Sequence, residues 1–332
     1  MSWMELSIDA THEAVDWVST LLAAIHYTGD VRIAKYIESD LNELRDAWVG
    51  RSHRNILLSP WALTICLYLP YDIHVHGRVE EIVNQLSPLH RTGLIAVPQT
   101  AIVEDKPEET ATIIPLVHRI GKRFVVLNPG ASYQSEAGDE VTLKIKTTLA
   151  FGSGLHPATI VSILLLERYI IPTMNVLDLG CGSGILSVAM AKLGASVLAL
   201  DNDIIAVDST KETIRINGLE NQVTVKKGSL GSGSDLGHWM GGNSINNVPT
   251  INGIDSFDLI VANILARVHI ALADDFRRAI RRTHEGTGIV ITAGFTTDYE
   301  DEVNTALVAA GFEAIDCERF NEWVELAHRL KE

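Results

Sequence analysis

The sequence from Val176 to Gly184 is V-L-D-L-G-C-G-S-G, a short apolar stretch that runs directly into three glycines. The apolar residues predict a buried strand. Gly180, Gly182 and Gly184 lack a Cβ, so the backbone can turn tightly and come close to a ligand. This stretch therefore predicts a strand that ends in a ligand-binding turn.

A helix and a second strand follow this turn. Residues 185–193 continue with helical periodicity, and the apolar run 196–200 ends at Asp201. A carboxylate at the end of that strand can accept two hydrogen bonds from a ribose diol. The order strand, glycine turn, helix, strand and acid predicts the first half of a doubly wound sheet, in which ligands bind outside the carboxyl ends of the strands.

The glycine spacing distinguishes between nucleoside cofactors. A dinucleotide site has the pattern G-x-G-x-x-G, whereas this chain has G-x-G-x-G with Asp178 before the first glycine. A carboxylate there would repel a pyrophosphate but attract an ammonium group. S-adenosylmethionine carries both an ammonium and a sulfonium, so we expect this cofactor, with Asp178 and Gly182 among its contacts. The alternative is a glycine turn that binds no ligand.

A second polar position follows the fourth strand of the expected sheet. Residues 257–266 are F-D-L-I-V-A-N-I-L-A, which places Asn263 at the carboxyl end of that strand. Its amide could hold an incoming amine next to the methyl group of the cofactor. The alternative is an asparagine that caps the following helix, residues 264–270.

An irregular loop precedes the glycine turn. Residues 151–159 are F-G-S-G-L-H-P-A-T, and a helix over 160–169 follows. Thr159 either caps this helix or contacts the cofactor. His156 is either a group that faces the ligand or an ordinary loop histidine, and we favour the latter.

Together, F-G-S-G-L-H-P-A-T, V-L-D-L-G-C-G-S-G, L-A-L-D and V-A-N-I-L-A, in this order, resemble the ribosomal protein L11 methyltransferase family (PrmA). Methyltransferases that act on bases or on glutamine usually carry Pro-Pro and an aromatic residue after the Asn or Asp. Here Ile264, Leu265 and Ala266 stand there, which disfavours base methylation.

The resemblance spans nearly the whole chain and implies a cytoplasmic enzyme. Such an enzyme transfers methyl groups from S-adenosylmethionine to lysine side-chain and N-terminal amines of a large-subunit ribosomal protein. Carried over by position, the cofactor contacts of the family fall on Thr159, Gly180, Asp201 and Asn263.

We expect an α/β fold in which a doubly wound Rossmann-like methyltransferase sheet follows a smaller ferredoxin-like α+β domain. The predicted parts are a substrate-recognition domain over 1–105, a linker over 106–122 and the methyltransferase domain over 123–332. The elements predicted in the first part are strands at 4–8, 63–69 and 92–103 and helices at 11–26 and 78–86. With one more strand after Gly29, the order is βαββαβ. The helix-like run 32–49 does not fit this order.

The second part is expected to open with a hairpin of residues 123–127 and 140–146. The further predicted strands are 175–179, 196–200, 222–226, 257–262, 287–292 and an antiparallel pair within 313–326. Residues 228–255 are rich in glycine, serine and asparagine. We expect this insertion to form a mobile loop in place of a helix.

Composition limits the partners. The chain has 332 residues, 46% of them hydrophobic, and a formal net charge of −15. This size allows two domains with large cores. The acidic balance argues against direct nucleic-acid binding, which depends on lysines and arginines, and favours a basic protein partner.

Cysteines and histidines give no sign of a disulfide framework or a metal. Cys66, Cys181 and Cys317 lie far apart and indicate a reducing compartment. Cys181 is expected to fill a crowded turn, since methyl transfer needs no thiol nucleophile. His74 and His76 have the spacing of two metal ligands on a strand but lack a third, so we expect no metal.

The N-terminus has no basic-then-apolar signal pattern. The longest apolar stretch, 56–70, is interrupted by Ser59 and Pro60 and is shorter than the roughly 20 residues of a membrane span. We therefore expect a cytoplasmic protein with no membrane association.

The predicted reaction is methyl transfer to lysine or N-terminal amines of ribosomal protein L11, with Asn263 as the catalytic residue that orients the amine. No dedicated general base is expected. Two alternatives remain. One is methylation of another protein lysine or of a small amine, and the other is a non-catalytic module that binds the cofactor and serves in an interaction.

Overall fold

The computed structural model describes residues 2–11, 14–25, 27, 30–36, 63–104, 117–127, 131, 133–135, 138–145, 156–231, 248–283 and 286–331. The chain divides into two compact units. The first consists of Met1–Arg119, Val125–Gly138 and Lys146–His156, and the second of Ile120–Phe124, Asp139–Ile145 and Pro157–Glu332.

The first unit contains a four-stranded antiparallel sheet with strand order β2-β3-β1-β4. Its elements in chain order are β1 (Trp3–Ala10), α1 (Ala14–Ala24), β2 (Asp30–Tyr36), β3 (Leu63–Pro70), α3 (Val75–Arg91) and β4 (Gln99–Val103). This is the order of a ferredoxin-like fold, so the βαββαβ prediction is confirmed.

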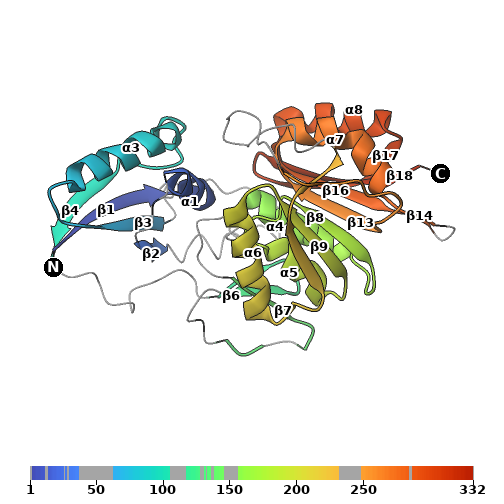
Figure 1. Ribbon diagram of the computed structural model, residues 1–332, viewed down its shortest axis with the longest axis horizontal. Helices are drawn as coiled ribbons and strands as arrows, with labels where there is room; N and C mark the ends of the chain where they lie inside the picture. The colour runs from blue at the N-terminus through green and yellow to red at the C-terminus, as the bar shows by residue number, and fades with distance from the viewer. Residues whose placement is uncertain are drawn as a thin grey trace, which may run out of the picture. The chain divides into compact units, whose positions relative to one another are not determined.

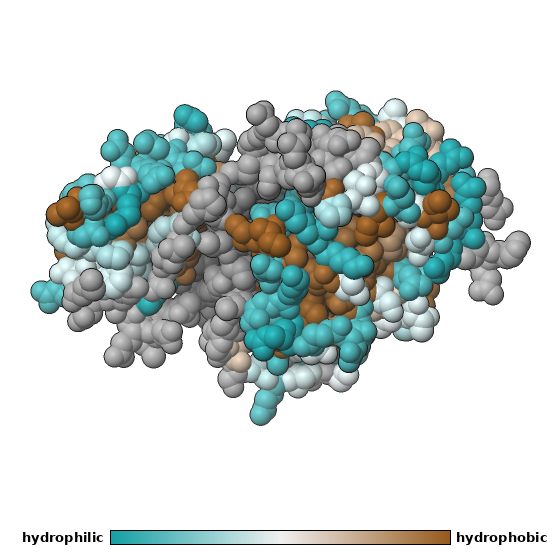
Figure 2. Space-filling model, in the orientation of Figure 1, coloured by the Kyte–Doolittle hydropathy of each residue, from teal (hydrophilic) through white to brown (hydrophobic). Residues whose placement is uncertain are grey.

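One face of this sheet is covered by both helices. Alternate residues of β1, among them Leu6 and Ile8, are fully buried against Val18 and Leu22 of α1 and Leu86 of α3. The opposite side of α3 is hydrophilic in Figure 2, as expected for an amphipathic helix at a surface.

Three predictions in this unit are corrected. Residues 32–36 belong to strand β2, so the helix expected from residue 32 is wrong there, and residues 37–49 lie outside the described part. Of the strand predicted over 92–103, only Gln99–Val103 is formed. His74 and His76 lie at the start of α3, whose N-cap is His74, and not on a strand. The predicted linker 106–122 lies outside the described part up to residue 116.

The second unit is built on a seven-stranded sheet of order β10-β9-β8-β13-β16-β18-β17. Its strands are β8 (Asn175–Leu179), β9 (Ser196–Asp201), β10 (Val223–Lys227), β13 (Leu259–Asn263), β16 (Ile289–Thr296), β17 (Phe312–Phe320) and β18 (Trp323–Leu330). The first five are parallel to one another, and β18 is antiparallel to both β16 and β17. The expected doubly wound sheet, with its antiparallel final pair, is confirmed.

Helices cover both faces of this sheet (Figure 1). They are α4 (Pro157–Tyr169), α5 (Ile185–Lys192) and α6 (Ile204–Asn217) on one face, and α7 (Ala266–Ala279) and α8 (Glu300–Ala309) on the other. On the second face, Leu272 and Phe276 of α7 and Leu307 of α8 are fully buried against Ile260 and Val290 of the sheet.

Shorter strands complete the structure. The predicted hairpin is present as β6 (Phe124–Leu127) and β7 (Val141–Lys144), and β5 (Val117–Ile120) adds a third strand on the other side of β6. The ends of the insertion are ordered, because β11 (Ser229–Leu230) pairs in parallel with β12 (Thr250–Ile251). β14 (Arg282–Thr283) and β15 (Gly286–Thr287) pair as two antiparallel strands. In the described part, no helix has the length and apolar character needed to cross a bilayer.

Candidate cofactor site

The predicted site residues on the strands and in the glycine turn meet at the carboxyl edge of the seven-stranded sheet. β8 lies between β9 and β13, with Leu179 opposite Leu200 on one side and opposite Ala262 on the other. The glycine turn after β8, Asp201 at the end of β9 and Asn263 at the end of β13 are therefore neighbours. The edge where parallel strands end is the usual ligand position of this fold.

The glycine turn needs glycine for two reasons. Gly180, Gly182 and Gly184 have φ values of +79°, +53° and +83°, a region that side-chain-bearing residues rarely adopt. A Cβ on Gly180 would also lie 2.5 Å from Ile264 Cγ2, and one on Gly184 would lie 3.0–3.2 Å from Thr210. The turn is thus fitted closely between β13 and α6.

Asp201 is held in a fixed orientation by two backbone amides. Gly182 N–H donates to Oδ2 and Asp203 N–H donates to Oδ1, both at 3.0 Å. These two bonds set the position of the Asp201 carboxylate relative to the glycine turn.

Asp178 is in a contrasting environment. Its carboxyl is fully buried, Ser187 Oγ of α5 donates to Oδ2 at 2.5 Å, and Oδ1 is buried with no hydrogen-bond partner. Burial, followed by the nearby negative charge of Asp201, raises the pKa of Asp178 to about 7. A cation beside Oδ1 would supply the interaction that the protein does not.

Asn263 does not cap the helix that follows it. The N-cap of α7 is Leu265, which makes no side-chain capping bond. Asn263 is half-buried, and its Oδ1 is buried without a hydrogen-bond partner. The capping alternative is therefore wrong, and the amide is available for a ligand.

Thr159 is the third residue of α4, so it is not the cap of this helix either. It is 1% exposed, and its Oγ1 is buried with no hydrogen-bond partner. His156, directly before α4, is fully buried, and burial lowers its pKa to about 3. His156 is therefore a neutral, buried imidazole, and whether it faces a ligand stays a prediction.

Cys181 is a packing residue within the turn. It is buried, and Thr210 Oγ1 lies 3.2 Å from its Sγ and 2.9 Å from the Gly182 carbonyl oxygen. Burial and the carboxylates of Asp201 and Asp178 raise the pKa of the Cys181 thiol well above its usual value. All three cysteines are free, and the described residues include no group of three His, Cys, Asp or Glu side chains that could hold a metal.

Sequence analysis missed several residues that support the site. Ser187 bonds to Asp178, Thr210 packs against the turn, and Gly294 and His269 pack against the segment that carries Asn263. Their partners are mostly backbone atoms far away in the chain, so no local pattern marks them. Only Ser187, in the first turn of the helix after the glycines, lies where a motif could have suggested it.

The chain is similar to known proteins over nearly its full length. The family model described as ribosomal protein L11 methyltransferase (PrmA) matches residues 2–331. Ribosomal protein L11 methyltransferases from Chloroflexus aurantiacus and Herpetosiphon aurantiacus are 36% and 34% identical, and each alignment covers 99% of this chain and at least 98% of the relative.

A solved structure, the ribosomal protein L11 methylase of Lactobacillus delbrueckii subsp. bulgaricus, is also similar. It has 28% sequence identity and a TM-score of 0.53, and the match covers 65% of this chain and 99% of that one. Because the family model matches nearly its full length, the chain belongs to the ribosomal protein L11 methyltransferase (PrmA) family.

Proposed function

We propose that this chain transfers methyl groups from S-adenosylmethionine to lysine side-chain and N-terminal amines of ribosomal protein L11. The observation that carries the proposal is a set of three buried oxygens with no hydrogen-bond partner. They are Thr159 Oγ1, Asp178 Oδ1 and Asn263 Oδ1. Buried polar atoms are nearly always paired, and two of these three, Asp178 Oδ1 and Asn263 Oδ1, lie on adjacent strands at the ligand edge of this fold, which supports a polar ligand there.

The chemistry of these groups fits the cofactor. Asp201 would accept the ribose hydroxyls, Asp178 would pair with the ammonium of the methionine part, and the glycine turn would let the ligand approach the backbone. When bound, S-adenosylmethionine supplies an electrophilic methyl group on a sulfonium leaving group. The task of the protein is then to place an amine in line with that carbon.

The amine must arrive without its proton. An unperturbed lysine has a pKa of about 10.4, so forming the neutral amine near pH 7 costs about 4–5 kcal/mol. Desolvation next to a cationic ligand lowers this cost because it disfavours the ammonium. The proposal therefore includes no dedicated general base, and the proton leaves to water before or during entry.

Asn263 is the residue proposed to hold the amine. Its Oδ1 and the Ile264 carbonyl oxygen both lie within 2.8 Å of the point where a Cβ of Gly294 would be. Oδ1 is buried with no hydrogen-bond partner in the protein, so it can accept a hydrogen bond from an incoming amine.

The acceptor is inferred from charge and family. The relatives are named for L11, and a net charge of −15 suits a basic partner. Methylation of another protein lysine or of a small amine is the second candidate, because the insertion over 228–255, rich in glycine, serine and asparagine, separates the third and fourth strands of the methyltransferase sheet.

The test is transfer of a labelled methyl group to a panel of purified ribosomal proteins. We expect label on L11, and we expect Asn263→Ala to lower kcat by about 100-fold while cofactor affinity changes far less, since positioning is lost and not binding. Asn221→Ala, an exposed asparagine after α6, is the matched control and should behave as wild type.

Three outcomes would contradict the proposal. Label on a different acceptor alone would reject L11 as the substrate. Unchanged turnover in Asn263→Ala would remove that residue from catalysis. Tight cofactor binding in calorimetry, with no transfer to any acceptor, would instead support the non-catalytic interaction module.

A further inference from the structure

A buried histidine forms hydrogen bonds to the segment that carries Asn263. His269, in the first turn of α7, is fully buried. Its Nε2 lies 3.1 Å from the Ile264 carbonyl oxygen and 2.8 Å from the Ala293 carbonyl oxygen. Because both partners are acceptors, Nε2 carries the proton and is shared between them.

This imidazole links β13 to β16. Ile264 directly follows Asn263 at the end of β13, and Ala293 lies in the middle of β16, opposite Asn263. Ile264 N–H also donates to the Ala293 carbonyl oxygen at 3.0 Å. Three hydrogen bonds thus fix Ile264 to β16 at the point where Asn263 enters the site.

Gly294 of β16 packs closely against Asn263 and Ile264. It has φ +88°, and a Cβ there would lie 2.6 Å from the Ile264 carbonyl oxygen and 2.8 Å from Asn263 Oδ1. The Ile264 carbonyl oxygen, which His269 holds, and the Asn263 amide oxygen therefore both lie against Gly294.

The protonation state of His269 suits this role. Burial lowers its pKa to about 4, so the ring is neutral throughout the physiological range. Its Nδ1 is buried with no hydrogen-bond partner, and its ring packs edge-on against Phe295 with centroids 5.5 Å apart. The apolar contact on one side and the two carbonyls on the other fix the tautomer with the proton on Nε2.

We propose that His269 is a positioning residue for methyl transfer, which acts through the Ile264 carbonyl to set the orientation of the Asn263 amide. The inference rests on the proposed function, because it assigns Asn263 its place beside the amine. His269 itself touches neither cofactor nor substrate in this proposal.

The test compares two buried histidines. His269→Leu removes the donor, and His269→Gln keeps an N–H at a similar reach. His328→Leu is the matched control, because His328 is also fully buried with a pKa lowered to about 4, but it bonds to Asn304 Oδ1 of α8 at 2.9 Å. All variants are assayed at the same interval below their own Tm, so that lost stability is separated from misplacement.

We expect His269→Leu to lower kcat by about 30-fold with little change in cofactor affinity, since a displacement of about 1 Å can cost about 100-fold. His269→Gln should recover most of the loss, and His328→Leu should keep the kcat of wild type. In an Asn263→Ala background, His269→Leu should have no further effect, because the two act as one unit.

A kcat for His269→Leu equal to that of His328→Leu, a glutamine variant no better than leucine, or additive effects with Asn263→Ala would each overturn the inference. If wild type transfers no methyl group to L11, the proposed function is wrong. The positioning role is then decided by crystal structures, in which an unmoved Asn263 amide in His269→Leu would reject it and a displaced one would support it.

Discussion

Asp178 and Asp201 are two carboxylates at the ends of adjacent strands with different environments. Asp201 is half-buried and accepts two backbone N–H groups. Asp178 is fully buried and has one hydroxyl donor and one oxygen without a partner. Asp201 is thus built to accept hydroxyls, whereas Asp178 lacks a compensating charge that a cationic ligand can provide.

This difference predicts a pH-dependent cofactor affinity. The pKa of Asp178 is raised to about 7 without ligand, and pairing with an ammonium requires the ionised form. Affinity should therefore fall as pH drops below 7, by up to about tenfold per pH unit. It should also fall above about pH 8, where an α-amino group loses its proton. Calorimetry from pH 5.5 to 8.5 measures both limbs.

Asp178→Asn is the comparison for this experiment. The amide cannot ionise, so binding should be weaker at pH 7.5 and nearly flat between pH 5.5 and 7. An acidic limb that persists unchanged in this variant would assign the titration to another group.

At the scale of elements, the turn between β8 and α5 depends on contact with α6. Gly184 is the N-cap of α5, and a Cβ there would meet Thr210 of α6 at 3.0–3.2 Å. Gly218, the C-cap of α6, has a similar φ of +68° but nothing within 4 Å of its Cβ position. The two glycines therefore separate backbone strain from crowding.

We expect Gly218→Ala to cost about 1 kcal/mol of folding free energy, from the left-handed backbone alone. Gly184→Ala should cost about 1–3 kcal/mol more, because Thr210 must shift, and it should also weaken cofactor binding by moving the turn. Denaturant unfolding and calorimetry on both variants test this. Equal losses of stability would show that the contact with α6 is unimportant.

The elements that the sequence predicts well are those with a strong local signal. The β8 strand is formed over 175–179 as predicted, because its apolar residues run straight into glycines that must turn. The helix α3 is longer than its predicted core of 78–86, since its first turn carries polar residues and Pro88 lies inside it. Residues 32–36 have helix-like composition but pair with β3, so tertiary pairing overrides local preference.

The site residues likewise include some that local sequence predicts and some that it does not. Asp178, Asp201 and the glycines follow directly from spacing along the chain, and the structure brings them together. Whether Asn263 caps α7 depends on the residue at which that helix begins, and local sequence leaves this undecided. His269 is invisible in the sequence because both of its acceptors are backbone carbonyls, one of them 24 residues away.

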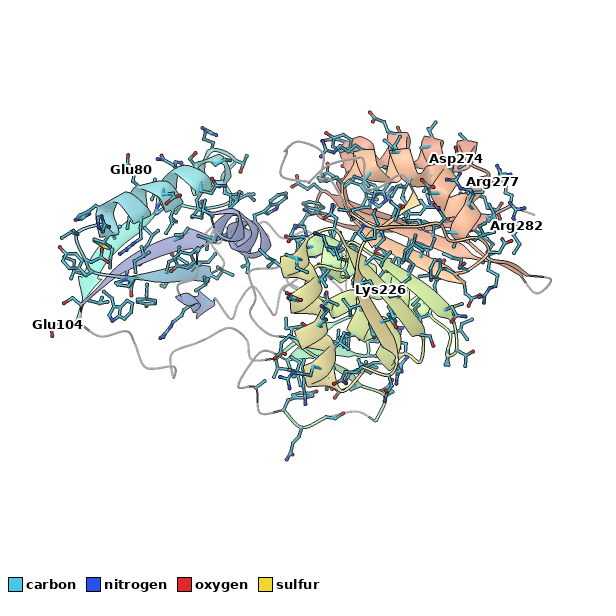
Figure 3. The ribbon with its side chains drawn as sticks, in the orientation of Figure 1. Glu80, Glu104, Lys226, Asp274, Arg277 and Arg282 are labelled. Atoms are coloured by element: carbon cyan, nitrogen blue, oxygen red, sulfur yellow. The ribbon has the colours of Figure 1, made fainter. Side chains whose placement is uncertain are left out.

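At the scale of the whole molecule, the negative net charge is the main property that affects the approach of a partner. Acidic residues outnumber lysines and arginines by 42 to 27. Exposed carboxylates such as Glu80 and Glu104 of the first unit project into solvent, whereas on α7 Asp274 lies near Arg277 (Figure 3). A basic acceptor should therefore be attracted over distances longer than a hydrogen bond.

This predicts that kcat/KM for L11 falls as salt rises from 50 to about 500 mM, while kcat and cofactor affinity change little. Added salt screens the approach of the two proteins but not the buried groups of the site. The double variant Glu80→Lys, Glu104→Lys should lower kcat/KM at low salt and flatten its salt dependence. A salt-independent kcat/KM in wild type would contradict steering.

The short parallel pair β11 and β12 constrains how the insertion can evolve. Ser229 and Leu230 run in the same direction as Thr250 and Ile251, so the chain between them must return to its starting edge before it pairs. A parallel connection needs about a dozen residues or more, unlike a hairpin. This segment can therefore be lengthened without disturbing the pair, but shortening it to a tight hairpin would abolish the parallel pairing of β11 with β12.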